Sequence, residues 1–199
     1  MALVLNGSAN TIGGLAVGGL PDGIVDTDMI AAGAVTGAKK GAGSILQVLQ
    51  AHKSDHQSND SGDEVDITGL SVAITPSSSS NKILVQYDVQ WGVSGSNNNV
   101  YGAILCYRDS TQIDLGDAVG SCHRVSGMDN PSSNYLVRRV GSMILDSPNT
   151  TSSVTYKMVM HCLNASDGRT MQINRTGLTS NADVNASFCS HITVMEVSA

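Results

Sequence analysis

Residues 82–91 read Lys82-Ile83-Leu84-Val85-Gln86-Tyr87-Asp88-Val89-Gln90-Trp91. From Ile83 onward every second side chain is apolar or aromatic, and polar side chains stand between most of them. Successive side chains of a strand point to opposite faces of a sheet, so this alternation predicts a strand with one buried face and one solvent-facing face. Trp91 continues the buried series, and we therefore expect it in the core rather than on a binding surface.

Strand-like stretches recur from residue 67 to the end of the chain and are separated by turn-rich runs. The predicted strands are residues 71–75, 82–91, 100–108, 111–115, 136–146, 154–164, 171–173 and 186–197. In residues 154–164 the side chains on one face are Val154, Tyr156, Met158, Met160 and Cys162. About eight to ten strands at regular spacing, with little room for helix, predict an all-β protein with an antiparallel jelly-roll sandwich. The long last strand is expected in the middle of a sheet.

The first part of the chain has a different composition. Residues 1–44 are rich in Gly and Ala and contain too few bulky side chains for a core of their own. We expect an extended arm with one short helix, in which Asp26 caps residues 27–32 and Gly33 ends the helix. Such a helix is too short to be stable alone, so the arm would order against neighbouring chains. The candidate anchoring residues of the arm are Leu20, Pro21, Asp22, Met29, Ile30, Lys39 and Lys40.

The segment that follows the arm is expected to connect it to the main domain. Residues 45–51 predict a first strand, and residues 55–66 are polar and acidic, which is typical of a linker. We therefore expect three parts: an anchoring arm at residues 1–44, a first strand and acidic linker at residues 45–66, and a jelly-roll domain at residues 67–199.

Composition limits the classes of function that this chain could have. Of its 199 residues, 14% are charged and 4% are aromatic, the net charge is −6 and the pI is about 5.1. No cluster of cations is present to neutralise nucleic-acid phosphates, and no stretch approaches the roughly 18 apolar residues of a membrane helix. A weakly charged surface rich in Ser, Asn and Thr suits a β-protein that packs against copies of itself rather than a solvated helical bundle.

The sequence contains no motif for a cofactor, metal or catalytic site. The glycine-rich arm lacks the Gly-Lys-Ser/Thr order of a phosphate loop, and an EF-hand alignment on Gly62 places Gln57 and Thr68 where carboxylates are required. No G-x-S-x-G motif is present, and Asp114 and Asp117 are interpreted as turn residues. A looser calcium site within the acidic stretch is left open.

Histidines and cysteines are interpreted as structural residues. His161 and His191 lie in predicted strands, where a hydrogen-bonded histidine is expected. His52 and His56 are four residues apart, but residues 51–58 do not look helical, so this spacing does not place them on one face. The cysteines form no C-x-x-C pair and are expected to be buried thiols that act as small hydrophobic side chains, although pairing is left open: Cys106, Cys122, Cys162 and Cys189.

Three short motifs in the arm carry a resemblance to a known family. They are Gly19-Leu20-Pro21-Asp22-Gly23, Ala34-Val35-Thr36 and Lys39-Lys40-Gly41. The segment that contains them resembles the N-terminal segment of fibre and virion structural proteins of tailed bacteriophages, notably marine and cyanobacterial phages. Residues 67–85, 103–109 and 193–197 resemble the C-terminal domain of such proteins, which is similar to the trimeric C1q/TNF-type jelly roll.

This resemblance implies a homotrimeric, non-enzymatic tail fibre that is assembled in the cytoplasm of the bacterial host and exposed on the phage particle. The arm would dock to a baseplate or tail protein, and the jelly-roll domain would bind a glycan or protein of the host surface. A head fibre or capsid decoration protein is the alternative hypothesis, and a polysaccharide depolymerase is the third. No cofactor, nucleic-acid partner or membrane insertion is expected.

Recognition is expected at loops, because jelly-roll strands are fixed by packing. The longest polar loop between strong strands is residues 126–135, in which Asp129, Asn130 and Asn134 offer donors and acceptors to sugar hydroxyls. Tyr135 offers a ring for stacking on a sugar, although packing at the start of the next strand is the favoured interpretation. The alternative is that both this loop and a second polar tip are simply solvated turns; the second tip is Asn97, Asn98 and Asn99.

Overall fold

A computed structural model of the chain describes residues 4–6, 11–13, 35, 40–95, 100–163, 165, 168–178, 183 and 185–199. The chain divides into two compact units, residues 1–41 and residues 42–199. In the first unit, β1 (Val4–Asn6) pairs antiparallel with β2 (Thr11–Gly13). Lys40 is described and exposed. The short helix expected at residues 27–32 lies outside the described residues, as do Leu20, Pro21, Asp22, Met29, Ile30 and Lys39.

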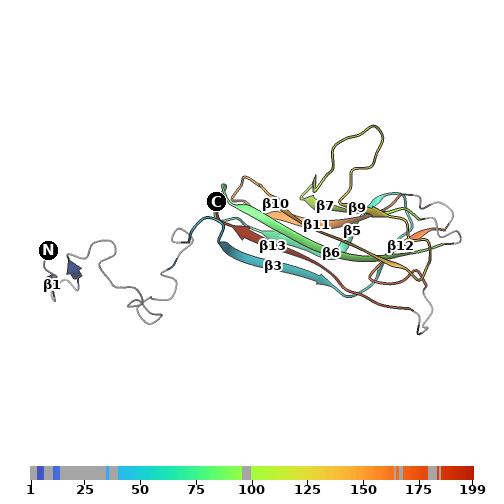
Figure 1. Cartoon of the computed structure of the whole chain (residues 1–199), viewed down its shortest axis with the longest axis horizontal. Helices are drawn as coiled ribbons and strands as arrows, with labels where there is room; N and C mark the ends of the chain where they lie inside the picture. The colour runs from blue at the N-terminus through green and yellow to red at the C-terminus, as the bar shows by residue number, and fades with distance from the viewer. Residues whose placement is uncertain are drawn as a thin grey trace. The chain divides into compact units, whose positions relative to one another are not determined.

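The second unit contains two antiparallel sheets (Figure 1). In the first sheet, four strands lie side by side in the order β3 (Ile45–Lys53), β13 (Ser190–Val197), β6 (Lys82–Ser94) and β10 (Val137–Asp146). The last residues of β6 pair with β12 (Thr170–Ile173), which in turn pairs with β4 (Gln57–Asn59). In the second sheet, β11 (Val154–Cys162) lies between β5 (Glu64–Ile74) and β7 (Gly102–Arg108). β7 also pairs with β8 (Thr111–Ile113) and β9 (Gly127–Asp129).

The chain passes back and forth between the two sheets, which is the connectivity of a jelly roll. Strands β3, β5, β6 and β7 lie in alternate sheets, and so do β9, β10, β11 and β13. β13 lies between β3 and β6, so the predicted central position of the last strand is confirmed. The described residues of this unit form strands and no helix, which confirms the predicted all-β sandwich.

The core lies between the sheets and is built largely from the inward-facing side chains of β6 and β11. The predicted alternation of β6 is confirmed, because all of its odd-numbered side chains from Ile83 to Trp91 are buried. The predicted face of β11, from Val154 to Cys162, is buried as well. Trp91 lies against Gly102, where a Cβ atom would be 2.4 Å from the indole ring. Glycine at this position is therefore a condition for placing Trp91 in the core.

Several segments near the sheet edges differ from the expectation. β3 pairs with β13 along its length and belongs to the same compact unit, so the jelly-roll unit begins at Ala42 rather than at residue 67. The expected acidic linker contains β4 and the start of β5, and the expected polar loop at residues 126–135 contains β9. β4 and β9 each pair with one neighbour and lie at sheet edges. Short edge strands need no buried apolar face, so their polar sequences resembled loops.

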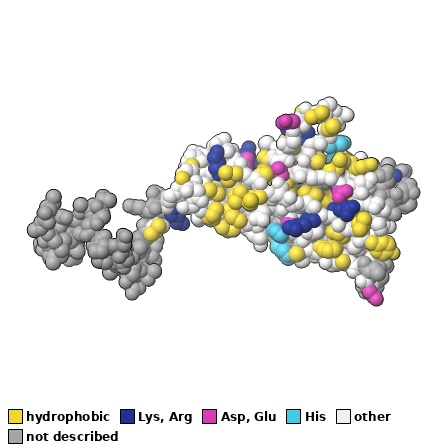
Figure 2. All heavy atoms as spheres, viewed as in Figure 1, with side chains coloured by type: hydrophobic (Ala, Val, Ile, Leu, Met, Phe, Trp, Pro, Cys, Tyr) yellow, Lys and Arg dark blue, Asp and Glu magenta, His cyan; other side chains and the backbone are white. Residues whose placement is uncertain are grey.

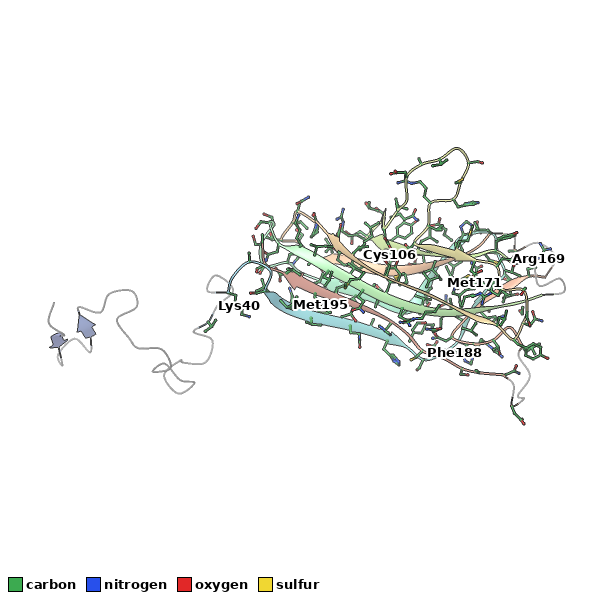
Figure 3. All side chains as sticks on the ribbon, viewed as in Figure 1. Lys40, Cys106, Arg169, Met171, Phe188 and Met195 are labelled. Atoms are coloured by element: carbon green, nitrogen blue, oxygen red, sulfur yellow. The ribbon has the colours of Figure 1, made fainter. Side chains whose placement is uncertain are left out.

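All four cysteines are free thiols. Cys106 and Cys162 are buried as predicted, and Cys106 lies between the sheets (Figure 3). Burial raises the pKa of the Cys106 thiol to about 12, so it is unreactive at neutral pH. The prediction is wrong for Cys122 and Cys189, which are exposed. Cys122 lies between β8 and β9, in a segment that projects from the sandwich (Figure 1), and Cys189 precedes β13.

Candidate functional site

The strand ends that lead into the loops expected to bind a receptor lie side by side at one end of the sandwich. At the end where residues 42–44 enter the domain, the start of β3 lies beside the end of β13. At the opposite end, here called the distal end, Val137 at the start of β10 pairs with Gly92 near the end of β6. The segment before β10 and the segment after β6 therefore leave the sheets at the distal end. Connectivity alone could not show this, and the tip of the second segment lies outside the described residues: Asn97, Asn98 and Asn99.

Asp129 contacts both β10 and its own loop. Its Oδ2 atom lies 2.8 Å from Nε of Arg138 on β10, in an ion pair. Its Oδ1 atom accepts a hydrogen bond from the backbone N–H of Asn130 at 2.6 Å. These contacts fix the turn that follows β9, so Asp129 has a structural role in addition to the binding role that we predict for it.

Asn134 and Tyr135 meet the rest of the fold in different ways. The carbonyl of Asn134 accepts a hydrogen bond from the N–H of Gly177 at 2.8 Å, which ties the loop to the segment after β12. Tyr135 is 58% exposed, so the favoured interpretation, packing at the start of the next strand, is wrong. Tyr135 precedes the first residue of β10 by two positions, and the strand does not hold its ring against the core. The ring is therefore available for stacking.

A second surface, which we did not foresee from the sequence, lies on the outer face of the first sheet. Cross-strand pairing places four apolar side chains, here called the apolar row, across β10, β6, β13 and β3: Leu145, Leu84, Met195 and Val48. Leu145 and Val48 are 57% and 54% exposed. Met143 and Ile45 are also exposed and extend the row. Figure 2 shows hydrophobic side chains gathered over these strand ends near the C-terminus, and Figure 3 labels Met195 on β13.

The sequence contained one ambiguous signal for the apolar row. Leu84 is the only apolar side chain at an outward-facing position of residues 82–91. Its register shows that it lies directly beside Leu145 on one side and Met195 on the other. A contiguous apolar patch of this kind on a domain surface marks an interaction site more often than a chance exposure.

Beside the apolar row, the outer face of the first sheet is polar and hollowed. Gly141 lies opposite Asp88 and has no side chain to fill the space between β10 and its neighbours. Asp88 is only 8% exposed; its carboxylate forms an ion pair with Arg139 and accepts a hydrogen bond from Nε2 of Gln90 at 2.8 Å. The resulting hollow has a volume of about 570 Å³ and is lined by Gln86, Tyr87, Asp88, Arg139, Gly141, Ser142, Met143 and His191.

The outer face of the second sheet carries a network of ion pairs and hydrogen bonds. Tyr107 donates a hydrogen bond to Glu64 at 2.6 Å, and burial together with this carboxylate raises the pKa of Tyr107 to about 12. Nζ of Lys157 lies 2.8 Å from both carboxylate oxygens of Asp66. His161 donates to a backbone carbonyl at 3.0 Å, which confirms the predicted strand histidine. These groups therefore pair with one another and stabilise this face of the sheet.

The acidic stretch was the place where a calcium site was left open. There, Oδ1 of Asn59 accepts hydrogen bonds from the backbone N–H and the hydroxyl of Ser61, both at 2.9 Å, and so closes a turn. In the part of the chain that the structure describes, no three or more His, Cys, Asp or Glu side chains are grouped so that they could hold a metal ion. Within the same described ranges, no helix has the length and apolar character needed to span a membrane.

No protein-family model matches the sequence, and no curated protein matches it significantly.

Proposed function

We propose that this chain is a non-enzymatic, homotrimeric fibre protein on the surface of a tailed bacteriophage particle. The arm would dock to a baseplate or tail protein, and the jelly-roll unit would present its distal end to a glycan or protein of the bacterial surface. The trimer and the phage particle are implied by the resemblance of arm motifs such as Gly19-Leu20-Pro21-Asp22-Gly23. The observation that supports self-association most directly is the apolar row on the outer face of the first sheet.

The outer face of the first sheet is suited to contact with copies of the same chain. Full burial of a large aliphatic side chain contributes about 1.5–3 kcal/mol, and the apolar row offers several such side chains next to one another. Asp88 is the only carboxylate among the outward-facing described residues of β3, β6, β10 and β13, and it is already paired with Arg139. An unpaired charge is the usual cost of burying a polar surface. Burial of this face would leave no carboxylate without a partner.

The self-association can be tested by placing a charge in the apolar row. We expect the purified chain to have a mass of three times 20.6 kDa by light scattering, and the Leu145→Asp variant to be monomeric. Leu145 is exposed on an edge strand, so the new carboxylate is solvated in the single chain and loses its hydration only in the contact.

Val119→Asp is a matched control for this experiment. Val119 is exposed to a similar degree and lies between β8 and β9, away from the first sheet, so this variant should remain trimeric. A monomeric parent chain, or a Leu145→Asp variant that keeps the mass of the parent, would contradict the proposed contact.

Receptor binding at the distal end can be tested by competition. An excess of the purified chain is expected to block adsorption of the phage to its host, and replacing Asn134 and Tyr135 together with Ala should weaken this block at least about tenfold. A stacked ring contributes roughly 1 kcal/mol, and a trimer multiplies the loss through avidity. The fold should persist, because Tyr135 is exposed and the hydrogen bond from Gly177 ends on the backbone carbonyl of Asn134.

Thr151→Ala is the control for the competition experiment, because Thr151 lies in the exposed turn between β10 and β11 at the entry end. This variant should block adsorption as well as the parent chain does. If the double variant also blocks fully while its circular dichroism spectrum is unchanged, the receptor contacts another part of the chain.

The alternative hypotheses give different outcomes in two simple experiments. Antibody fragments against residues 42–199 should label the tail tip of whole particles in electron micrographs. A regular lattice of label on the head would instead indicate a head fibre or capsid decoration protein. Incubation of the pure chain with host polysaccharide should release no new reducing ends, and their release would indicate a depolymerase.

A further inference from the structure

We propose that self-association through the outer face of the first sheet is switched by pH, because the assembled state requires neutral His52 and His191. This inference rests on the proposed self-association and adds its regulation. Two observations carry it. The two histidines are direct cross-strand neighbours on that face, and the carboxylate beside them is already engaged by other residues.

His52 and His191 lie directly opposite each other in the antiparallel pair of β3 and β13. They share the face of the apolar row, because Val48 and Met195 lie four residues away along the same two strands. Side chains directly opposite each other in such a pair have Cβ atoms about 4.5–5.5 Å apart. Two protonated imidazole rings at this spacing repel each other.

Asp88 is the acidic group closest to this pair in the sheet, since it lies opposite His191 in the pairing of β13 and β6. Its charge is compensated by Arg139 from β10 and by the amide of Gln90. The carboxylate is also largely buried beneath the hollow that His191 lines. The negative charge of Asp88 is therefore already balanced by Arg139, so protonation of His191 adds net positive charge to this face.

The other charged residues of these strands add no acid to the outer face. Lys53 of β3 and Glu196 of β13 point to the opposite face and are buried. Lys82 of β6 faces outward toward the entry end, where its Nζ donates to Oγ of Ser147 at 2.7 Å. The outer face thus carries two cations, Lys82 and Arg139, and the one carboxylate described above. Protonation of both histidines raises its charge from one positive to three positive per copy.

Contact between copies would remove this face from water. A protonated imidazole would then lose hydration without gaining a partner, and like charges on neighbouring copies would repel. An ordinary imidazole titrates near pH 6.5. Because each histidine has to lose its proton before this face is buried, the dissociation constant for self-association should rise as the pH falls from 7.5 to 5. Assembly at neutral pH and dissociation in acid follow from this linkage.

Sedimentation velocity of the full chain at pH 7.5 and at pH 5, at equal ionic strength, tests the proposal. The parent is expected to be assembled at the higher pH and dissociated at the lower one. The double variant His52→Gln/His191→Gln, whose new side chains stay polar but cannot be protonated, is expected to remain assembled at both. The single variant His52→Gln, at an exposed position, should show an intermediate shift. His123→Gln changes an exposed histidine between β8 and β9 and should behave as the parent does.

The possible outcomes separate the regulation from the self-association itself. A parent that stays assembled at pH 5, or a double variant that dissociates there as the parent does, overturns the inference and leaves the proposed self-association standing. Loss of the β-sheet circular dichroism signal at pH 5 also overturns it, because unfolding would then cause the dissociation. A parent that is monomeric at pH 7.5 overturns the proposed self-association, and this inference with it.

Discussion

Replacement of Glu196 by Gln is expected to lower the free energy of unfolding by about 3 kcal/mol. Glu196 is 1% exposed, and its Oε1 atom accepts hydrogen bonds from the N–H and hydroxyl of Ser77 at 2.6 and 2.7 Å and from Nδ2 of Asn81 at 2.6 Å. Its Oε2 atom accepts from Nε2 of Gln47 at 2.7 Å. A glutamine would turn an NH₂ group toward groups that are themselves donors. At least one buried donor would then lose its partner.

Urea denaturation of the two proteins measures this effect, with Glu64→Gln as the control. Glu64 also accepts a hydrogen bond, from the hydroxyl of Tyr107, but it is exposed, so its replacement should cost less than about 1 kcal/mol. A similarly small loss for Glu196→Gln would show that the carboxylate is not an important link between β13, β3 and the turn before β6.

The contribution of Glu196 should also depend on pH. Burial acts to raise the pKa of this carboxyl, but the hydrogen bonds from Asn81, Ser77 and Gln47 outweigh burial and hold the pKa below its ordinary value of 4.5. A carboxyl with a lowered pKa in the folded state contributes stability above its unfolded pKa and loses it as the pH falls through the folded pKa. The stability difference between parent and Glu196→Gln should therefore be largest at neutral pH and shrink below about pH 4.5. A difference that stays constant down to pH 3 would contradict this account.

Replacement of Asn174 by Ala is expected to lower the free energy of unfolding by about 3–4 kcal/mol. Asn174 is fully buried where β12 ends, and its Nδ2 atom donates to the carbonyls of Lys53 and Asp55 at 2.9 and 3.1 Å. Its Oδ1 atom accepts from the hydroxyl of Ser190 at 2.6 Å, and its backbone N–H bonds to Gln90 at 2.9 Å. One side chain thus joins the ends of β3 and β12 to the start of β13.

Backbone conformation adds to this cost, because Asn174 has a φ of 63°, which asparagine and glycine adopt more readily than alanine. Asn174→Gly removes the strain but not the loss of hydrogen bonds, so it should recover only about 1 kcal/mol of the loss in thermal or urea unfolding. Asn149→Ala is a matched control, since Asn149 has a φ of 53° but is exposed. Equal losses at the two positions would show that the backbone conformation, and not the buried hydrogen bonds, determines the effect.

Sequence patterns along single strands were sufficient to determine the fold class. A strand with one buried face repeats its apolar side chains every two residues, and this period is visible without knowledge of any partner strand. The alternation of residues 82–91 and of residues 154–162 therefore identified two main core strands and the buried position of Trp91. The regular recurrence of such strands, separated by turns, indicated an antiparallel sandwich with the last strand in the middle of a sheet.

Only the tertiary structure decided which strands lie side by side and in which register. The sequence of a single strand indicates which of its faces is buried. The partner strand and the register of the pairing depend on residues far away along the chain. The apolar row, the pair of His52 and His191, and the contacts of Glu196 and Asn174 all arise from such pairings. The edge strands β4 and β9 were missed for a related reason. They are held by backbone N–H and C=O groups, which nearly every residue possesses and which leave no pattern in the sequence.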